Sequence, residues 1–219
     1  MGRLYRGLVT LAARMLGGIE VPELDEFLGR MSGRGETSAI FWRSTEYSYR
    51  WLLAEVDIWA QRLGQQGVGQ GTVVGMMGEY SPQVCALCFA LMRVGAVLVP
   101  FNRNSTTQMP EYCRLAGVEH LLRFDADDGW SIEPVSSHEQ NQLILGFSER
   151  QHPGLVVFTS GSSGEPKGIL HDCEHVLKKF AVERPGYRAL LFLLIDHFGG
   201  FNTLMSVFAY GGTAVIPAS

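Results

Sequence analysis

Short, almost continuously apolar segments recur along the chain, and stretches with helical spacing separate them. A strand that is apolar on both faces has to be covered on both, which is typical of parallel sheets. The alternation of such strands with helices therefore predicts an α/β fold, a doubly wound and mostly parallel sheet with helices on both faces. The predicted strands are TVVGMM (72–77), GAVLVP (95–100), EHLLRF (119–124), GLVVFTS (154–160), ALLFLLI (189–195) and TAVIPA (213–218).

Helix and turn signals supply boundaries between these strands. Ser81 and Pro82 form an N-cap and first-turn pair for a helix through Arg93. Pro100 is expected to end its strand, and the polar residues 125–151 are expected to form a surface hairpin and a connector. Further predictions are a hairpin of 38–42 with 46–49, a helix over 52–63, one from Thr106 or Thr107, and helices over 172–182 and 200–210.

Composition and charge limit the classes of protein to which this chain can belong. With 46% hydrophobic and 18% charged residues, the 219-residue chain is expected to fold into a globular core. The net charge of −4 and the scattered basic residues argue against a nucleic-acid partner. Four cysteines without regular spacing favour a reducing cytoplasm, and no window approaches the ~18 consecutive apolar residues of a membrane span.

The first 18 residues, MGRLYRGLVTLAARMLGG, contain three arginines and no acidic residue. This pattern fits an organellar presequence or an interfacial helix. It also fits an amphipathic helix that docks its leucines on the same domain.

The segment TSGSSGEPKG, residues 159–168, follows one of the apolar strands and precedes the predicted helix 172–182. Its glycines allow backbone amides to approach a bulky anion closely, and its hydroxyl groups can donate hydrogen bonds. Lys167 adds a positive charge. In doubly wound sheets, ligands bind beyond the carboxyl ends of the strands. The segment therefore predicts a loop that holds phosphate groups.

Two other interpretations of this segment are a flexible linker and a Walker loop. A Ser/Gly-rich stretch can be a flexible linker. A Walker loop would require GK[ST], whereas Glu165 and Pro166 separate Gly164 from Lys167, and Gly168 occupies the hydroxyl position. A P-loop kinase or GTPase is accordingly disfavoured.

The spacing [ST]-S-G-[ST]-[ST]-G-x-P-K-G resembles the signature of the adenylate-forming superfamily of acyl- and aryl-CoA synthetases, adenylation domains and luciferases. The run from YSYRWLL to GAVLVPFN is similar to the opening of that family, and DHFGGFNTLMSVFAYGGTAVI is similar to the segment that borders its acyl pocket. The similarity extends from about Phe27 onward. Thr72 departs from the usual aspartate of the family.

The resemblance implies an enzyme that joins a carboxylic acid to ATP, forming an acyl-adenylate and pyrophosphate, and then transfers the acyl group to the thiol of CoA or a carrier protein. It implies ATP and Mg²⁺ as cofactors, with Mg²⁺ bridging the phosphates. By the same analogy, the residues around the β- and γ-phosphates are Thr159, Ser160, Gly161, Ser162, Ser163, Gly164 and Lys167.

The resemblance also places His197 at the border of the acid pocket, with Phe198, Gly199 and Gly200 beside it. Asp196 and Asn202 are further candidate neighbours. The alternative for His197 is a histidine at a helix start that is satisfied by a backbone group. No catalytic residue and no protein metal ligand is assigned.

Enzymes of the family are about twice as long as this chain, so residues 1–219 are expected to be the incomplete N-terminal part of an AMP-binding domain without the C-terminal lid. Such a chain alone is expected to be inactive, and its uncovered apolar surface is expected to favour a homo-oligomer. The alternatives are a non-catalytic nucleotide-binding or interaction module derived from the family, and a kinase-like phosphotransferase.

One pair of cysteines and one pair of histidines have the spacing of metal ligands. Cys85 and Cys88 form a CxxC, but both lie in an apolar helical stretch without a second ligand pair, which favours core packing. His171 and His175 are spaced for one helix face, yet no third ligand is evident.

Overall fold

The structure is a computed structural model that describes residues 22–135, 141–160 and 166–217, apart from the side chains of Asn104 and Ser160. Its larger sheet has six strands in the order β6-β5-β3-β4-β7-β8. The four inner strands are parallel, and β6 and β8 pair antiparallel at the two edges. The bounds are β3 (Val73–Met77), β4 (Val97–Phe101), β5 (His120–Phe124), β6 (Trp130–Pro134), β7 (Gly154–Ser160) and β8 (Pro166–Asp172).

The remaining strands form a second, four-stranded sheet in the order β2-β1-β10-β9. In it β1 (Ser38–Trp42) and β2 (Thr45–Ser48) make the predicted hairpin. β10 (Thr213–Ile216) lies parallel to both β1 and β9 (Arg188–Leu190), with Ile40 opposite Ala214. The doubly wound α/β prediction is confirmed, but the division of the strands between two sheets was not predicted.

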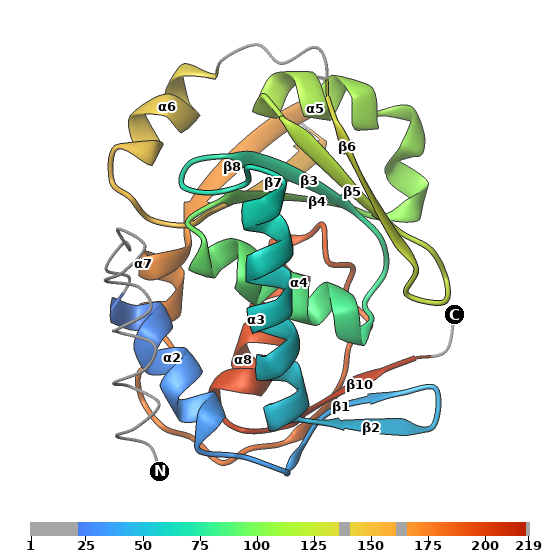
Figure 1. The fold of residues 1–219 in the computed structure, drawn as a ribbon, viewed down its shortest axis with the longest axis vertical. Coiled ribbons are helices and arrows are strands. Elements are labelled where there is room, and N and C mark those ends of the chain that lie inside the picture. The colour runs from blue at the N-terminus through green and yellow to red at the C-terminus, as the bar shows by residue number, and fades with distance from the viewer. Residues whose placement is uncertain (1–21, 136–140, 161–165, 218–219) are drawn as a thin grey trace.

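Helices cover both faces of the six-stranded sheet and fill the space between the sheets (Figure 1). On one face, β3 and β4 pack with α5 (Met109–Ala116) and α6 (Gln142–Ser148) around Val73, Val97 and Val99. The other face, which includes Val74 and Met76, joins the main core. The helices of that core are α2 (Pro22–Ser32), α3 (Tyr49–Gln65), α4 (Pro82–Arg93), α7 (Cys173–Lys178) and α8 (Phe198–Ala209).

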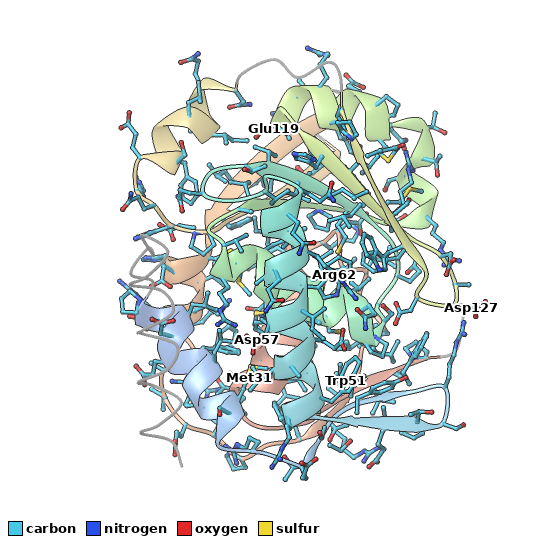
Figure 2. All side chains as sticks on the ribbon, in the orientation of Figure 1. Met31, Trp51, Asp57, Arg62, Glu119 and Asp127 are labelled. Carbon is cyan, nitrogen blue, oxygen red and sulfur yellow. The ribbon has the colours of Figure 1, made fainter. Side chains whose placement is uncertain are left out.

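The helix α4 is buried on nearly all sides because its sequence, PQVCALCFALMR, is apolar all round. Ser81 caps it as predicted, since its hydroxyl oxygen accepts the N–H of Val84 at 3.1 Å. On α3, Asp57 pairs with Arg93 of α4. Asp57 and Arg62 both lie on α3 (Figure 2). The Arg62 guanidinium lies over the Trp59 and Trp130 rings, at 5.1 and 5.4 Å from their centroids.

Several predicted boundaries are wrong. β4 continues through Pro100 to Phe101. Odd-numbered residues of β4 face β3, as the bond from Val97 N–H to Thr72 O shows, so the Pro100 nitrogen faces β7. The ladder between β4 and β7 includes only Val97 and Leu98, and Pro100 therefore removes no ladder hydrogen bond there.

Other elements differ in length from their predictions. A 3₁₀ helix, η1 (Arg103–Thr107), occupies the expected helix start, and α5 begins only at Met109. α7 ends at Lys178, and β9 has three residues because the chain after Leu190 leaves the sheet. The hairpin and connector expected over 125–151 appear as β6, which pairs with β5, and α6. Among the described helices, none combines the length and apolar character that crossing a membrane requires. The N-terminal segment 1–18 lies outside the described residues.

Candidate active site

The predicted phosphate loop connects two antiparallel strands of the six-stranded sheet. Thr159 and Ser160 end β7, Lys167 lies in β8, and Thr159 is paired with Lys167. The expectation that a helix directly follows the loop is wrong, because β8 comes between the loop and α7. Gly161, Ser162, Ser163 and Gly164 lie outside the described residues. The loop therefore begins at the carboxyl end of β7, which is the edge where parallel sheets bind ligands.

Aromatic packing fixes the base of this hairpin. Phe158 stacks on Tyr112 of α5 with ring centroids 4.2 Å apart and planes inclined by 6°. Gly168 lies opposite Phe158, and a Cβ there would be 3.2 Å from Phe158 Cε1 and 3.3 Å from Val156 Cγ1. A glycine at 168 thus leaves room for the ring across the two strands. Phe158, Gly168 and eight other residues line a shallow cavity of about 140 Å³.

The polar groups at the loop ends suit an anion. The side chains of Thr159 and Lys167 are exposed, and Thr159 Oγ1 lies 3.5 Å from Lys167 O. Within the described residues, no carboxylate forms a salt bridge with Lys167. A hydroxyl group and an ammonium group at one sheet edge can both donate hydrogen bonds to phosphate oxygens.

The four predicted pocket residues lie at the start of α8. His197 is exposed, is the N-cap residue, and its carbonyl accepts the N–H groups of Gly200 and Phe201 at 2.9 and 3.2 Å. Phe198 is half-buried, Gly199 exposed and Gly200 buried. The alternative of a side chain satisfied by the helix start is not supported, because His197 makes no side-chain cap hydrogen bond.

The two predicted halves of the site meet through His171 of β8. Its ring stacks on that of Phe198, with centroids 4.3 Å apart and planes inclined by 20°. The Lys179 ammonium lies 4.9 Å from the centroid of the Phe198 ring and donates to Asn202 Oδ1. The described contacts thus join the hairpin to the start of α8 through His171 rather than through Thr159 or Lys167.

Burial governs the charge state of this cluster. Burial, and secondarily the positive charge of Lys179, lowers the pKa of His171 from its ordinary value. The pKa of Lys179 is also lowered by burial. A His171 with a lowered pKa is neutral at pH 7, and its stack on Phe198 is a contact between an uncharged imidazole and a phenyl ring.

The cysteine and histidine pairs do not assemble a metal site. Cys85 and Cys88 are fully buried in α4, and burial raises the pKa of Cys88 to about 12, so neither supplies a thiolate. His175 is exposed on α7, whereas His171 faces Phe198. Over the ranges that the structure describes, no group of three histidine, cysteine or carboxylate side chains is placed to hold a metal ion.

Three polar residues near the site were missed by the sequence reasoning. Tyr80 follows β3, Asn102 follows β4 and Ser105 lies in η1. Asn102 and Ser105 donate to the carboxylate of Asp196, just before α8. A usable signal was available, because polar residues directly after parallel strands lie at the ligand-binding edge of the sheet.

The chain is similar in sequence to known enzymes. A model of the AMP-binding enzyme family matches residues 29–219. The 2-succinylbenzoate–CoA ligase of Bacillus pumilus is 24% identical over 200 residues, which are 83% of this chain and 41% of that protein. The nonribosomal peptide synthetase malG of Malbranchea aurantiaca is 31% identical over 150 residues, which are 63% of this chain and 6% of that protein.

A solved structure shows the same fold. The N-terminal subdomain of Klebsiella oxytoca NpsA, in complex with 3-hydroxyanthranilyl-AMSN, superposes with a TM-score of 0.69 at 21% identity. The match covers 88% of this chain and 53% of that one. This chain thus spans less than half the length of the CoA ligase and about half of the solved subdomain chain. Because the family model matches most of its residues, the chain belongs to the AMP-binding enzyme family.

Proposed function

We propose that this chain supplies the phosphate-binding loop and one wall of the acid pocket of an ATP-dependent carboxylate ligase. The observation that carries the proposal is the β7–β8 hairpin, which has Thr159 and Lys167 at the carboxyl end of β7 and contacts the start of α8 through His171 and Phe198. The CoA ligase and peptide synthetase relatives support the reaction class.

The reaction brings two anions together. A carboxylate oxygen of the acid attacks the α-phosphorus of ATP, a new oxygen–phosphorus bond forms, and pyrophosphate leaves with the electrons of the broken bond. Positive charge and amide dipoles have to offset the repulsion and hold the attack geometry. Residues proposed to bind the β- and γ-phosphates are Thr159, Ser160, Gly161, Ser162, Ser163, Gly164 and Lys167.

The donor set of the hairpin fits ATP with Mg²⁺. Hydroxyl groups and Lys167 can donate hydrogen bonds to phosphate oxygens, and those oxygens would in turn supply ligands to Mg²⁺. When bound, the metal offsets phosphate charge. Thr159 and Lys167 would orient the phosphate tail from the two strands of the hairpin.

The acid is proposed to lie against the start of α8. His197 and Phe198 would form its wall with the exposed Gly199 beside them, and Gly200, which packs closely against Leu194 O and the Tyr80 hydroxyl, would hold that wall in place. The acyl-adenylate would then pass its acyl group to a thiol of CoA or of a carrier protein. We place the reaction in the cytoplasm because all four cysteines are free and buried.

Self-association is part of the proposal. Val182, Leu190 and Phe192 are large apolar side chains that remain exposed on the segment around β9, with Phe192 73% exposed. Exposed apolar side chains that form a contiguous patch mark interfaces, and we propose that these three contribute to one. A concentration-dependent increase in sedimentation coefficient is expected, and a profile that stays monomeric across the micromolar range would contradict it.

Nucleotide binding tests the loop assignment. Each charge-assisted hydrogen bond contributes about 1.5 to 3 kcal/mol, so Lys167→Ala should weaken ATP·Mg²⁺ binding about 10- to 100-fold in isothermal titration. Lys178→Ala, another exposed lysine eleven positions on, is the matched control and should bind as the parent does. Equal affinities of the parent and Lys167→Ala would exclude the loop as the phosphate site.

Pyrophosphate exchange tests the reaction class. The longest natural form of the protein that contains these residues should incorporate labelled pyrophosphate into ATP only when a suitable carboxylic acid is present. A panel of aryl and alkyl acids identifies the acid class. Release of ADP in place of pyrophosphate would show a phosphotransferase and overturn the proposal.

A further inference from the structure

A carboxylate anchors the turn before α8 to the end of β4. The side-chain amide of Asn102 and the hydroxyl group of Ser105 both donate to Asp196 Oδ2, the latter at 3.3 Å. Asn102 is buried directly after β4, and Ser105 lies in η1. These donors are more than 90 positions from Asp196 in the chain, and their bonds fix two distant segments to each other.

The anchored turn leads directly into the predicted pocket wall. Leu194 O accepts the N–H of His197 at 3.2 Å, and Asp196 lies inside the turn that this bond closes. His197 then begins α8 as its N-cap residue, without a side-chain cap bond. The Asp196 carboxylate therefore does not cap α8, and instead it holds the backbone from which His197 and Phe198 project.

Tyr80 restrains the same turn from the side of β3. Its side chain is buried, and a Cβ at Gly200 would lie 2.7 Å from its hydroxyl oxygen. Burial, with a smaller contribution from the charge of Asp196, raises the pKa of Tyr80, so the phenol stays neutral. The first turn of α8 is thus held between Tyr80 and the Asn102–Asp196 contact.

The positions of Asp196 and Tyr80 leave two buried polar atoms unsatisfied within the part of the chain that the structure describes, which destabilises the fold. Asp196 Oδ1 and the Tyr80 hydroxyl are buried atoms without a hydrogen-bond partner among the described residues. A buried polar atom left unsatisfied destabilises a folded protein, so packing does not explain a carboxylate at a turn whose neighbours Leu191 and Ile195 are already in the core.

We propose that Asp196 is a positioning residue of the acid pocket, which fixes His197 and Phe198 where the acid binds. This inference rests on the proposed function and assigns the specific contact that sets the pocket wall. Asp196 acts through the turn rather than by touching ATP. Its loss should therefore weaken the use of the acid and leave the use of ATP nearly unchanged.

Two substitutions separate positioning from general stability. Asp196→Ala removes the acceptor of both donors, whereas Asp196→Asn keeps the shape and one acceptor oxygen. Glu133→Ala is the control, because it removes a carboxylate from an exposed ion pair with Arg123 at the edge strand β6. All three are measured by pyrophosphate exchange in the longest natural form of the protein.

The KM for the acid and the KM for ATP are expected to respond differently to Asp196→Ala. In Asp196→Ala the KM for the acid should rise about tenfold, the equivalent of roughly 1.4 kcal/mol, while the KM for ATP stays within about twofold. Asp196→Asn should restore the KM for the acid to within about threefold of the parent. An equal rise of both KM values, or no rescue by asparagine, would reduce Asp196 to a structural residue and overturn the proposal.

Hydrogen exchange of the backbone amides, measured on the 219-residue chain, tests the anchoring role of Asp196 independently of catalysis. In Asp196→Ala, amides of residues 194–201 should lose protection, and Asp196→Asn and Glu133→Ala should keep it. Unchanged protection in Asp196→Ala would overturn the anchoring role. If the parent shows no acid-dependent exchange of pyrophosphate, the proposed function fails, and this measurement still decides whether Asp196 holds the turn.

Discussion

His171 of β8 and Phe198 of α8 stack with their ring centroids 4.3 Å apart. These residues belong to different parts of the candidate site, since β8 carries Lys167 of the proposed phosphate loop and Phe198 begins the proposed pocket wall. The stack gives the loop hairpin and the pocket wall a shared contact. Lys179, at the end of α7, also contacts this cluster. Its ammonium group lies over the Phe198 ring and over the Phe180 ring.

A double-mutant cycle should detect the stack as a coupling energy. Aromatic pairs contribute about 0.5 to 1.5 kcal/mol beyond their buried area, so His171→Ala and Phe198→Ala should show an interaction of that size in urea unfolding. A cycle of His175→Ala with Phe198→Ala is the control, because His175 is exposed on α7. Additive effects in the first cycle would show that the ring contact does not stabilise the fold.

The lowered pKa of His171 predicts a pH-dependent stability. Its folded-state pKa lies below the ordinary value of about 6.5, so between the two values the unfolded chain binds more protons. The contribution of His171 is therefore complete above pH 6.5 and decreases as the pH falls toward the folded-state pKa. The stability difference between the parent and His171→Gln should shrink from pH 7.5 to pH 5.

Two measurements check this direction. The imidazole proton signals of His171 in NMR should titrate with a midpoint below that of a free histidine. In a Lys179→Met background the midpoint should move upward, because one of the two causes of the lowered pKa has been removed. A midpoint at or above 6.5 in the parent chain would contradict the burial of this ring.

Neighbouring glycines in the first turn of α8 should respond very differently to alanine. A Cβ at Gly200 would lie 2.1 Å from Leu194 O and 2.7 Å from the Tyr80 hydroxyl, so Gly200→Ala has to displace backbone. We expect a loss of at least about 2 kcal/mol in the free energy of unfolding. Both variants are compared by urea denaturation with the parent.

Gly199→Ala is the matched control for this prediction. The nearest atom to its new Cβ would be Leu193 Cδ1 at 3.4 Å, an ordinary contact with a flexible side chain. Alanine is favoured over glycine inside a helix by about 1 kcal/mol, so the variant should be neutral or slightly stabilised. Equal losses for the two variants would show that the close approach of Tyr80 and Leu194 does not constrain Gly200.

The arrangement of strands and helices was largely predictable, and its failures have local causes. The apolar segments and the Ser81–Pro82 start signal located β3, α4, β4 and β7. The segment 189–195 is as apolar as these, yet only Arg188–Leu190 forms a strand. Leu191 and Ile195 follow the strand and pack into the core. Hydrophobic periodicity alone does not distinguish apolar residues of a strand from apolar residues of a core-packed segment without regular structure.

The candidate site was predictable only in part. Glycine, hydroxyl and lysine residues at fixed spacing predict a phosphate loop, because those groups are contiguous in the chain. His171 was considered only as a metal ligand, and Tyr80, Asn102 and Ser105 were not considered. Their roles depend on which side chains face one another across β3, β4, β8 and α8, and pairing of that kind leaves no mark in a single sequence.

By itself, the sequence determined the fold class and the family, and it placed the proposed phosphate loop, because these follow from short-range patterns of apolar, glycine and hydroxyl residues. The tertiary structure alone decided that the strands divide into two sheets and that β7 and β8 form a hairpin. It also decided that His171 joins this hairpin to α8, and that Asp196 joins the turn before α8 to the end of β4. Those contacts join residues about 30 to more than 90 positions apart. Packing of the whole core, rather than any local preference, sets such distances.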